Sequence, residues 1–303
     1  MATNITEVAD AITAEYPIIR NGLLPRWHEA GDSTWEAAEW ALTYVQRCVE
    51  SRGGIEQAVD AFAQTSIDFL RLQARFRQTR QYARSTAAGL VDELYSDPEE
   101  MGGHYLDGLA MTYAMWPNHA KLLEFYRNSF VASLPDAPIS VEIGPGHGLL
   151  GFTLLTDRPA SSYVALDISA PALDFITEAF AANGLTTPVE LIVGDATDMN
   201  DARIPTEADS IVCCEVLEHV DDPASILGSI RDRLRPTGRA FLSTVANLEA
   251  IDHVYLYEDA DQIRSMIRES GFEIVDERAM ELPGDDSEGF TPLNYACIVA
   301  PAG

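Results

Sequence analysis

The residues best suited to chemistry stand in a glycine-rich segment that follows a short apolar run. The run covers residues 139–143, and the chain continues with GPGHG at residues 144–148 before a stretch with helical spacing. Alternate glycines let the backbone turn sharply and approach a ligand closely, where any Cβ atom would collide. The dinucleotide-binding fingerprint would need a further glycine at position 149, which is Leu in this chain. The segment therefore predicts either a ligand site of another kind or a simple strand-to-helix turn.

Three more apolar runs end in residues that suit a ligand. They are followed by Asp167 and Ile168, by Asp195 and Ala196, and by Glu215. Asp167 could accept both hydroxyls of a ribose, Ile168 could cover the face of a base, and Asp195 could accept from an exocyclic amine. In open α/β sheets, ligands bind beyond the carboxyl ends of the strands, where all these residues are expected.

Three histidines are candidates for a general base, because imidazole titrates near neutral pH. His219 follows the fourth apolar run, His253 follows the fifth, and His119 lies in the N-terminal half. His219 has the alternative role of capping or packing the next helix, and the pattern leaves the role of His253 equally open. The four cysteines form no CxxC pair and have no histidine at zinc spacing, so the sequence predicts no metal site.

The elements that must position these residues change character near residue 135. Before it, apolar residues recur at helical spacing in four expected helices that begin near residues 33, 55, 101 and 117. After it, helical stretches alternate with apolar runs at 139–143, 163–166, 189–193, 210–214, 240–245, 272–275 and 295–300. This alternation predicts an α/β fold with a Rossmann-like, doubly wound sheet. We therefore predict a helical N-terminal domain over residues 1–135 and a Rossmann-like domain over residues 136–303.

Charge and composition exclude several classes of partner. The 303 residues carry 48 acidic and 20 basic side chains, a formal net charge of −28. A field of that sign repels phosphate backbones and anionic lipid headgroups, so we expect neither nucleic acid nor a membrane as a partner. No apolar stretch has the roughly 18 residues of a membrane span, and the N-terminus lacks the pattern of a signal peptide. With cysteines that read as reduced thiols, the sequence predicts a soluble cytoplasmic protein.

Taken together, the strand-end residues resemble the class I S-adenosylmethionine-dependent methyltransferases. The resemblance covers about residues 136–300, and its motifs occur in the family's order: VEIGPGHG, ALDIS, VGDAT, CCEVLEHVDDP and LRPTGRAFLSTVAN. The fourth is similar to the corresponding motif of the ubiquinone-type O-methyltransferases. In the fifth, residues 236–238 are Pro-Thr-Gly where the family usually has Pro-Gly-Gly, a difference in an expected surface turn. The resemblance implies a seven-stranded sheet whose last strand is antiparallel.

The resemblance also implies a set of cofactor contacts. Glu142, Gly144 and Gly146 would surround the methionine part, and Asp167 would hold the ribose. The adenine would contact Ile168, Asp195 and Ala196, and Glu215 would line the approach to the sulfonium. In the helical half, Tyr105 would reach the carboxylate of the cofactor, or would be an ordinary aromatic helix contact. His147 is expected to contact the cofactor rather than to act as a base. An acidic site suits S-adenosylmethionine because its sulfonium and ammonium groups are both cationic.

We therefore predict an enzyme that transfers a methyl group from S-adenosylmethionine to oxygen, nitrogen or carbon of a small molecule and releases S-adenosylhomocysteine. We expect this reaction to belong to specialised metabolism, such as natural product biosynthesis. The helical half would cap the acceptor and could form a homodimer. A protein or RNA methyltransferase, and a cofactor-binding protein of this fold without transfer activity, are the alternatives. The arginines between Arg71 and Arg84 either pair with acidic groups of this chain or a partner subunit, or anchor an anionic acceptor.

Overall fold

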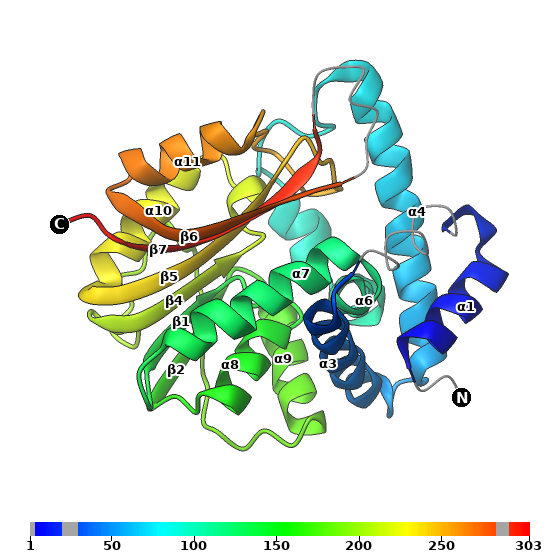
Figure 1. Ribbon diagram of the computed structural model, residues 1–303, viewed down its shortest axis with the longest axis horizontal. Coiled ribbons are helices and arrows are strands. Elements are labelled where there is room, and N and C mark those ends of the chain that lie inside the picture. Colours follow the sequence, from blue (N-terminus) through cyan, green and yellow to red (C-terminus); the bar gives the residue numbers. More distant parts are fainter. Residues whose placement is uncertain (1–3, 20–29, 283–290) are drawn as a thin grey trace.

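The computed structural model describes residues 4–19, 30–282 and 291–303. A twisted sheet forms the centre, helices cover both of its faces, and the N-terminal helices gather at one end of it (Figure 1). The first described helix, α1 (Ile5–Glu15), and the C-terminal end of the chain lie on opposite sides of the molecule in this view.

The sheet has seven strands, as predicted. They are β1 (Ile139–Ile143), β2 (Ser162–Asp167), β3 (Glu190–Val193), β4 (Ala208–Cys214), β5 (Leu234–Ala246), β6 (Phe272–Glu281) and β7 (Leu293–Pro301). Their order in the sheet is β3-β2-β1-β4-β5-β7-β6. β7 lies antiparallel between β5 and β6, which confirms the antiparallel last strand. The strand order reverses between β1 and β4, the place where doubly wound sheets bind their ligands.

The helices after the strands begin and end close to the residues that the sequence predicts. They are α8 (Leu149–Asp157), α9 (Ala170–Ala182), α10 (Pro223–Arg233) and α11 (Ala260–Glu269). Side-chain caps start three of them: Ser169 accepts from the third residue of α9, and Asp222 and Asp259 do the same for α10 and α11. These helices place the strand-to-helix loops at the carboxyl edge of the sheet.

The described part of residues 1–135 contains helices and no strand. Its α-helices are α1 (Ile5–Glu15), α3 (Asp32–Val49), α4 (Ile55–Thr79), α5 (Pro98–Glu100), α6 (Leu106–Met115) and α7 (Pro117–Phe125). Three short π-helical segments also occur in this part of the chain: η1 (Val91–Tyr95), η2 (Met101–Tyr105) and η3 (Tyr126–Val131). The sequence analysis did not predict α1 or η1.

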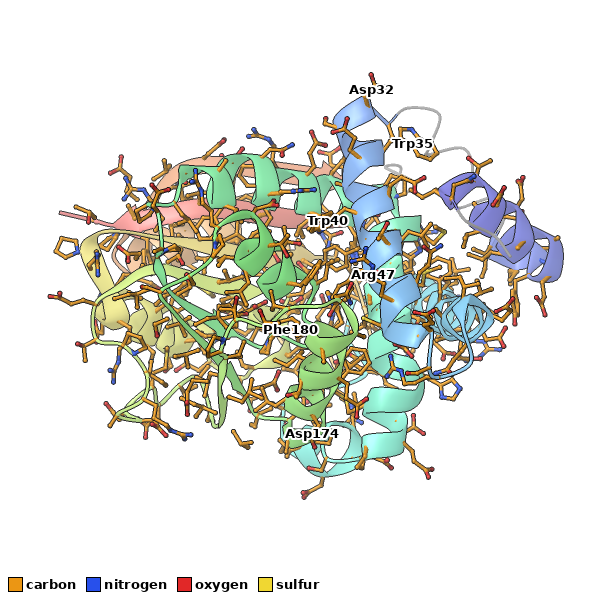
Figure 2. All side chains as sticks on the ribbon, turned by 90° about the horizontal axis from the view of Figure 1, so that it is seen from below. Asp32, Trp35, Trp40, Arg47, Asp174 and Phe180 are labelled. Atoms are coloured by element: carbon orange, nitrogen blue, oxygen red, sulfur yellow. The ribbon has the colours of Figure 1, made fainter. Side chains whose placement is uncertain are left out.

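The helical part and the sheet share a hydrophobic core. One cluster of buried residues runs from Ile5 in α1 to Ile298 in β7, and a second fills the other face of the sheet. Figure 2 shows α3 crossing beside α9, and the Trp40 indole of α3 donates to the Thr153 hydroxyl of α8 at 2.9 Å. The division into domains at residue 135 therefore stays a prediction.

Candidate functional site

A cavity of about 320 Å³ opens at the carboxyl ends of β1 and β4, under α4 and α6. Eight of the predicted site residues line it: Tyr105, His119, Glu142, Gly144, Gly146, Glu215, His219 and His253. The other four, Asp167, Ile168, Asp195 and Ala196, follow β2 and β3 outside the lining of this cavity. The predicted residues thus divide into a cavity group and an adjoining group at the ends of the next two strands.

The glycine loop needs glycine on steric grounds. Gly144 and Gly146 have φ angles of +62° and +49°, which side-chain-bearing residues rarely adopt. A Cβ atom on Gly144 would lie 2.5 Å from a methyl carbon of Val216. A side chain at position 144 would therefore clash with the residue that follows Glu215.

Beneath the loop, the carboxyl group of Glu142 is 2% exposed and accepts a hydrogen bond from the Tyr163 hydroxyl. Burial raises the pKa of Glu142 to about 7. A cationic ligand above this loop would therefore lie near a carboxyl group that is poised to ionise.

The adjoining group has the surface that a nucleoside needs. Asp167 accepts the Ser169 N–H at 2.8 Å, and burial raises the pKa of this carboxyl group to about 6. Ile168 and Val193 are 42% and 60% exposed, although both are large apolar side chains. Asp195 uses one carboxylate oxygen to accept the Thr197 N–H and hydroxyl, which leaves the other oxygen open. Val193 was not predicted as a site residue. An apolar residue at the end of a strand is the feature of the sequence that could have indicated it.

Glu215 is held in a strained position at the end of β4. Its φ angle is +53°, unusual for a residue with a side chain. The carboxylate accepts from the Ser243 hydroxyl at 2.7 Å and from the Asn294 amide at 3.0 Å. The Asn118 amide of α7 donates to Asn294 in turn, so a chain of hydrogen bonds links the helical part to this carboxylate. Burial raises the pKa of Glu215 to about 8.

The structure brings His219 and His253 together and adds Glu218, which the sequence analysis did not single out. The two rings are 5.0 Å apart, and the possible ligand atoms of the three residues all lie within 4.8 Å of one another. The Nδ1 atoms lie 3.1 Å and 2.8 Å from the carbonyl oxygens of Asp252 and Leu248. Since a carbonyl only accepts, both Nδ1 atoms carry hydrogen, and each neutral ring has its lone pair on Nε2. We call Glu218, His219 and His253 the acceptor cluster.

The carboxylate of the acceptor cluster is half satisfied. One oxygen of Glu218 accepts from the Thr244 hydroxyl at 2.7 Å, whereas the other is buried and has no partner among the described residues. That oxygen lies 3.9 Å from Nε2 of His219. With both rings neutral, the cluster presents three proton-accepting atoms. Burial alone would lower the pKa of His219, but Asp252 and Glu218 raise it above its ordinary value, so this ring takes up a proton readily. The spacing of Glu215, Glu218 and His219 in the sequence is the signal that could have revealed it.

Two tyrosines from the helical part meet beside the acceptor cluster. Tyr95 and Tyr105 donate to the same oxygen of Asp252, at 3.0 Å and 2.5 Å. That oxygen also lies 3.5 Å from Nδ1 of His219. Burial alone would raise the pKa of Asp252, but His219 and His253 lower it below its ordinary value. The hydroxyl of Tyr105 thus contacts Asp252, and the proposed contact with the cofactor's carboxylate stays a prediction.

His119 lines the cavity apart from the acceptor cluster. Its Nδ1 lies 2.7 Å from the Thr112 hydroxyl, and its ring packs 5.2 Å from Trp116 and 5.1 Å from Tyr113. Burial lowers the pKa of His119 to about 3, so the ring is neutral at physiological pH. His119 thus packs among aromatic side chains of the helical part.

The arginine cluster holds the loop after β5 rather than the cavity. Arg75 in α4 pairs with the buried Glu249 at 2.8 Å, and Arg84 donates to the Ile251 carbonyl at 3.1 Å. Both contacts tie the helical part to the loop that carries Asp252 and His253. No arginine or lysine stands among the described residues that line the cavity. The ion-pair interpretation of these arginines is therefore the one that fits the structure.

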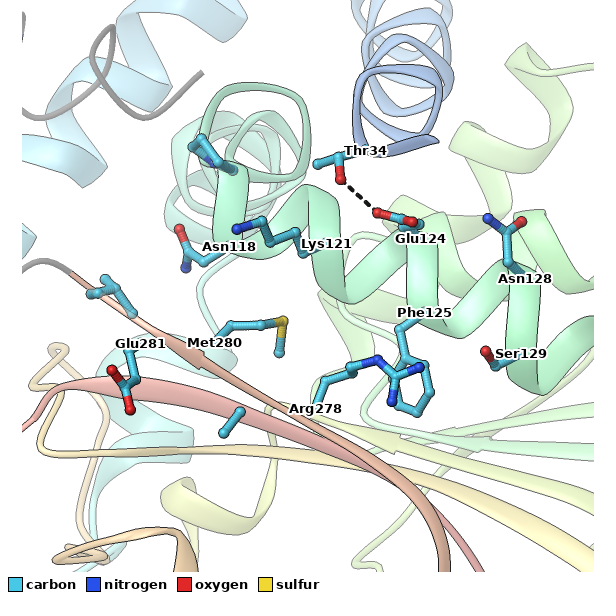
Figure 3. Close-up of a pocket in the computed structure, with 13 residues that line it drawn as sticks. Thr34, Asn118, Lys121, Glu124, Phe125, Asn128, Ser129, Arg278, Met280 and Glu281 are labelled. Atoms are coloured by element: carbon cyan, nitrogen blue, oxygen red, sulfur yellow. Dashed lines mark hydrogen bonds between the residues drawn. The ribbon is translucent and has the colours of Figure 1, made fainter. Parts of the chain in front are cut away.

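A second cavity, of about 470 Å³, lies between α7 and β6 and contains none of the predicted residues (Figure 3). Two of its charged side chains are engaged: Glu124 accepts from Thr34 at 2.6 Å, and Arg278 pairs with Asp276 at 2.7 Å.

Among the described residues, no helix is long and apolar enough to cross a membrane.

Comparison with known proteins places the glycine loop and the strands around it in a family. Residues 141–240 match the model of a methyltransferase domain. The mitochondrial ubiquinone biosynthesis O-methyltransferase of Schizosaccharomyces pombe is 24% identical over 183 residues, which are 57% of this chain and 65% of that protein. The ubiquinone biosynthesis O-methyltransferase of Cupriavidus pinatubonensis is 34% identical over 111 residues, 36% of this chain and 43% of that protein. The matches thus span less than two thirds of either relative.

Among solved structures, the cyclase SpnF superposes with a TM-score of 0.50 and 15% identity. The match covers 62% of this chain and 83% of that one. At this level of identity, the likeness shows the shared fold alone.

Proposed function

We propose that the chain is a class I S-adenosylmethionine-dependent methyltransferase that transfers a methyl group from this cofactor to a hydroxyl oxygen of a small molecule. The observation that carries the proposal is the acceptor cluster, which offers proton-accepting atoms. A hydroxyl group holds its proton near neutral pH and must lose it during transfer, so such an acceptor needs a group of this kind. The curated relatives named above are also O-methyltransferases.

The residues around the glycine loop fit the cofactor. When bound, S-adenosylmethionine supplies a methyl group on a cationic sulfonium, ready for in-line displacement. Gly144 and Gly146 line the cavity with backbone alone, where the methionine part would bind, and Asp167 can accept the ribose hydroxyls. Ile168 and Val193 offer apolar surface next to Asp167 for the adenine. These residues bind and orient the cofactor, while the helical cap excludes water from the cavity.

The charge of the cavity limits the acceptor. Six carboxyl groups line it, and the described lining residues include no arginine or lysine: Asp68, Glu100, Glu142, Glu215, Glu218 and Asp252. Such a site stabilises the cationic sulfonium and disfavours an anionic acceptor. Apolar and aromatic side chains, including Phe69, Leu72 and Trp116, form the opposite wall. We therefore propose an uncharged, largely apolar acceptor with a hydroxyl group.

The acceptor cluster also has the composition of a divalent-cation site, and we extend the proposal to a cation at this position. Histidines that bind metals usually donate their other ring N–H to a carbonyl or carboxylate, as His219 and His253 do here. The free oxygen of Glu218 supplies a third ligand atom. A mixed set of two imidazoles and one carboxylate suits a transition metal such as Zn²⁺ or Mn²⁺. A cation there would supply positive charge that lowers the pKa of a nearby hydroxyl group.

Elemental analysis of the purified protein tests the cation. We expect Zn²⁺ or Mn²⁺ to copurify or to bind after dialysis against a chelator, and His219→Ala and His253→Ala to abolish that binding. His104→Ala is the matched control, because His104 lines the same cavity outside the acceptor cluster. If the protein binds neither metal while methyl transfer survives the chelator, the sequence prediction of no metal is correct. The histidines then act on the proton directly.

The alternatives differ in where the methyl group goes. The protein named as a cyclase shares this fold, so the fold alone does not establish methyl transfer. A protein or RNA acceptor would have to enter a cavity of about 320 Å³ that is lined by carboxyl groups. We retain specialised metabolism and a homodimer as predictions, to be tested by identification of the acceptor and by sedimentation.

A further inference from the structure

The glycine loop contains a histidine whose hydrogen position is fixed by its surroundings. His147 is 9% exposed and lines the cavity next to Gly146. The backbone N–H of Leu149, the first residue of α8, donates to its Nδ1 atom at 3.2 Å. A backbone N–H only donates, so Nδ1 carries no hydrogen, and the hydrogen of the neutral ring is on Nε2. His147 thus offers the cavity a single N–H donor.

We propose that the Nε2–H group of His147 binds the carboxylate of the methionine part of the cofactor. The inference rests on the proposed function only in that S-adenosylmethionine is the cofactor, and it assigns the group that recognises one end of it. The loop that carries His147 is the loop expected to surround the methionine part. The sequence predicts Tyr105 as a partner of the cofactor's carboxylate. In the structure, the hydroxyl of Tyr105 already donates to Asp252.

The charge of the cavity makes such a donor necessary. Carboxylates are usually bound by arginine or lysine, and the described lining of this cavity contains neither. Its six carboxyl groups would repel the carboxylate of the ligand. A neutral N–H donor at the loop would therefore help to offset the loss of water around that carboxylate.

Several other donors of the cavity are already used within the chain. The Nδ1–H groups of His219 and His253 donate to backbone carbonyls. The hydroxyls of Thr65 and Thr112 also donate to carbonyls, and the amides of Asn118 and Asn294 donate within the chain of bonds to Glu215. The Nε2 atom of His147 has no hydrogen-bond partner among the described residues.

The ring of His147 is also held in place. Tyr113 packs against it with ring centroids 5.0 Å apart, and the Tyr44 hydroxyl donates to its backbone carbonyl at 2.6 Å. With Nδ1 bonded to Leu149, the imidazole has no freedom to exchange its two nitrogens without losing a hydrogen bond. The donor is therefore preorganised, which reduces the entropy lost when the ligand binds.

Two substitutions separate the donor from the loop contact. In His147→Asn, the side-chain oxygen can still accept the Leu149 N–H, but the donor at the Nε2 position is gone. In His147→Gln, the amide nitrogen reaches about the Nε2 position, but the acceptor for Leu149 is gone. Tyr113→Phe is the control for the neighbouring hydroxyl. Binding is measured by calorimetry with S-adenosylhomocysteine and with its decarboxylated analogue, which keeps the ammonium group, so no turnover is needed.

For His147→Asn we expect S-adenosylhomocysteine to bind about tenfold more weakly or worse, since a hydrogen bond to a charged group is lost. The decarboxylated analogue should bind this variant within about twofold of the wild type, and His147→Gln should largely retain the affinity for S-adenosylhomocysteine. Equal losses for the two ligands, or no loss in His147→Asn, would overturn the inference and leave the proposed function intact. If the wild type bound neither ligand, the cofactor assignment itself would fall, and the inference with it.

Discussion

Replacement of Glu142 by Gln should stabilise the protein at alkaline pH and leave its stability nearly unchanged at acidic pH. Glu142 is buried below the glycine loop, and burial raises its pKa from 4.5 to about 7. Because the folded state holds the proton more tightly than the unfolded state, this group favours folding below pH 4.5. That contribution is lost as the pH rises through 7. Gln stays neutral at every pH and can still accept the hydrogen bond from Tyr163.

The expected size follows from the same pKa values. A pKa raised from 4.5 to about 7 corresponds to about 3 kcal/mol in the free energy of unfolding, fully expressed above pH 7. Urea unfolding of the wild type and of Glu142→Gln at pH 5, 6, 7 and 8 measures it. The difference between the two proteins should be about 1 kcal/mol or less at pH 5 and grow to about 3 kcal/mol in favour of the variant at pH 8. All other groups titrate in both proteins, so they cancel in this comparison.

A difference that is the same at pH 5 and pH 8 would show that Glu142 does not titrate in this range. A variant less stable than the wild type at pH 8 would show that the ionised carboxylate is stabilised by its surroundings. Either result would refute the argument that desolvation dominates at this position.

Three further perturbations test the packing of the cap, the arginine cluster and the nucleoside site. Gly108→Ala should lower the free energy of unfolding by about 1–3 kcal/mol in urea titrations, because its Cβ would lie 2.9 Å from the Ala61 carbonyl oxygen of α4. Gly102→Ala is the control and should leave the free energy of unfolding nearly unchanged, because its Cβ meets nothing within 4 Å. Equal effects of the two substitutions would contradict the close packing at Gly108. Arg75→Glu should lower the melting temperature, because it leaves the buried Glu249 carboxylate facing a second negative charge; a change confined to the KM of the acceptor would instead support the anchor hypothesis. Asp167→Asn should weaken binding of S-adenosylhomocysteine and of adenosine alike in calorimetry, by about tenfold, whereas a loss for S-adenosylhomocysteine alone would remove Asp167 from the ribose.

The sheet could be predicted because β1, β2, β4 and β7 are buried on both faces over most of their length. Each of the seven apolar runs named in advance is a strand, since continuous apolar runs between helical stretches indicate a buried parallel sheet. The antiparallel direction of β7 followed from the family resemblance, not from periodicity. The helix α1 was missed, although its buried side chains at residues 5, 8, 9 and 12 have helical spacing.

The candidate site was predicted where it depends on local sequence and missed where it depends on contacts far along the chain. Gly144 and Asp167 stand directly at strand ends, so the residue order places them. The meeting of Glu218 with His253 depends on the fold of the loop after β5. An ion pair between Glu249 of that loop and Arg75, from a distant segment, holds it. Periodicity carries no information on such pairings. The same holds for the tyrosines that reach Asp252.

The most direct test of methyl transfer uses purified protein, methyl-labelled S-adenosylmethionine and a fractionated cell extract. We predict label in the small-molecule fraction, as a product whose methyl group is attached to oxygen, and loss of that label with His219→Ala but not with His104→Ala. Label in the protein or RNA fraction would contradict the proposed acceptor class and keep the chemistry. Binding of S-adenosylhomocysteine without label in any fraction, repeated with a panel of phenols and other hydroxyl compounds, would contradict the central claim that this chain is a methyltransferase.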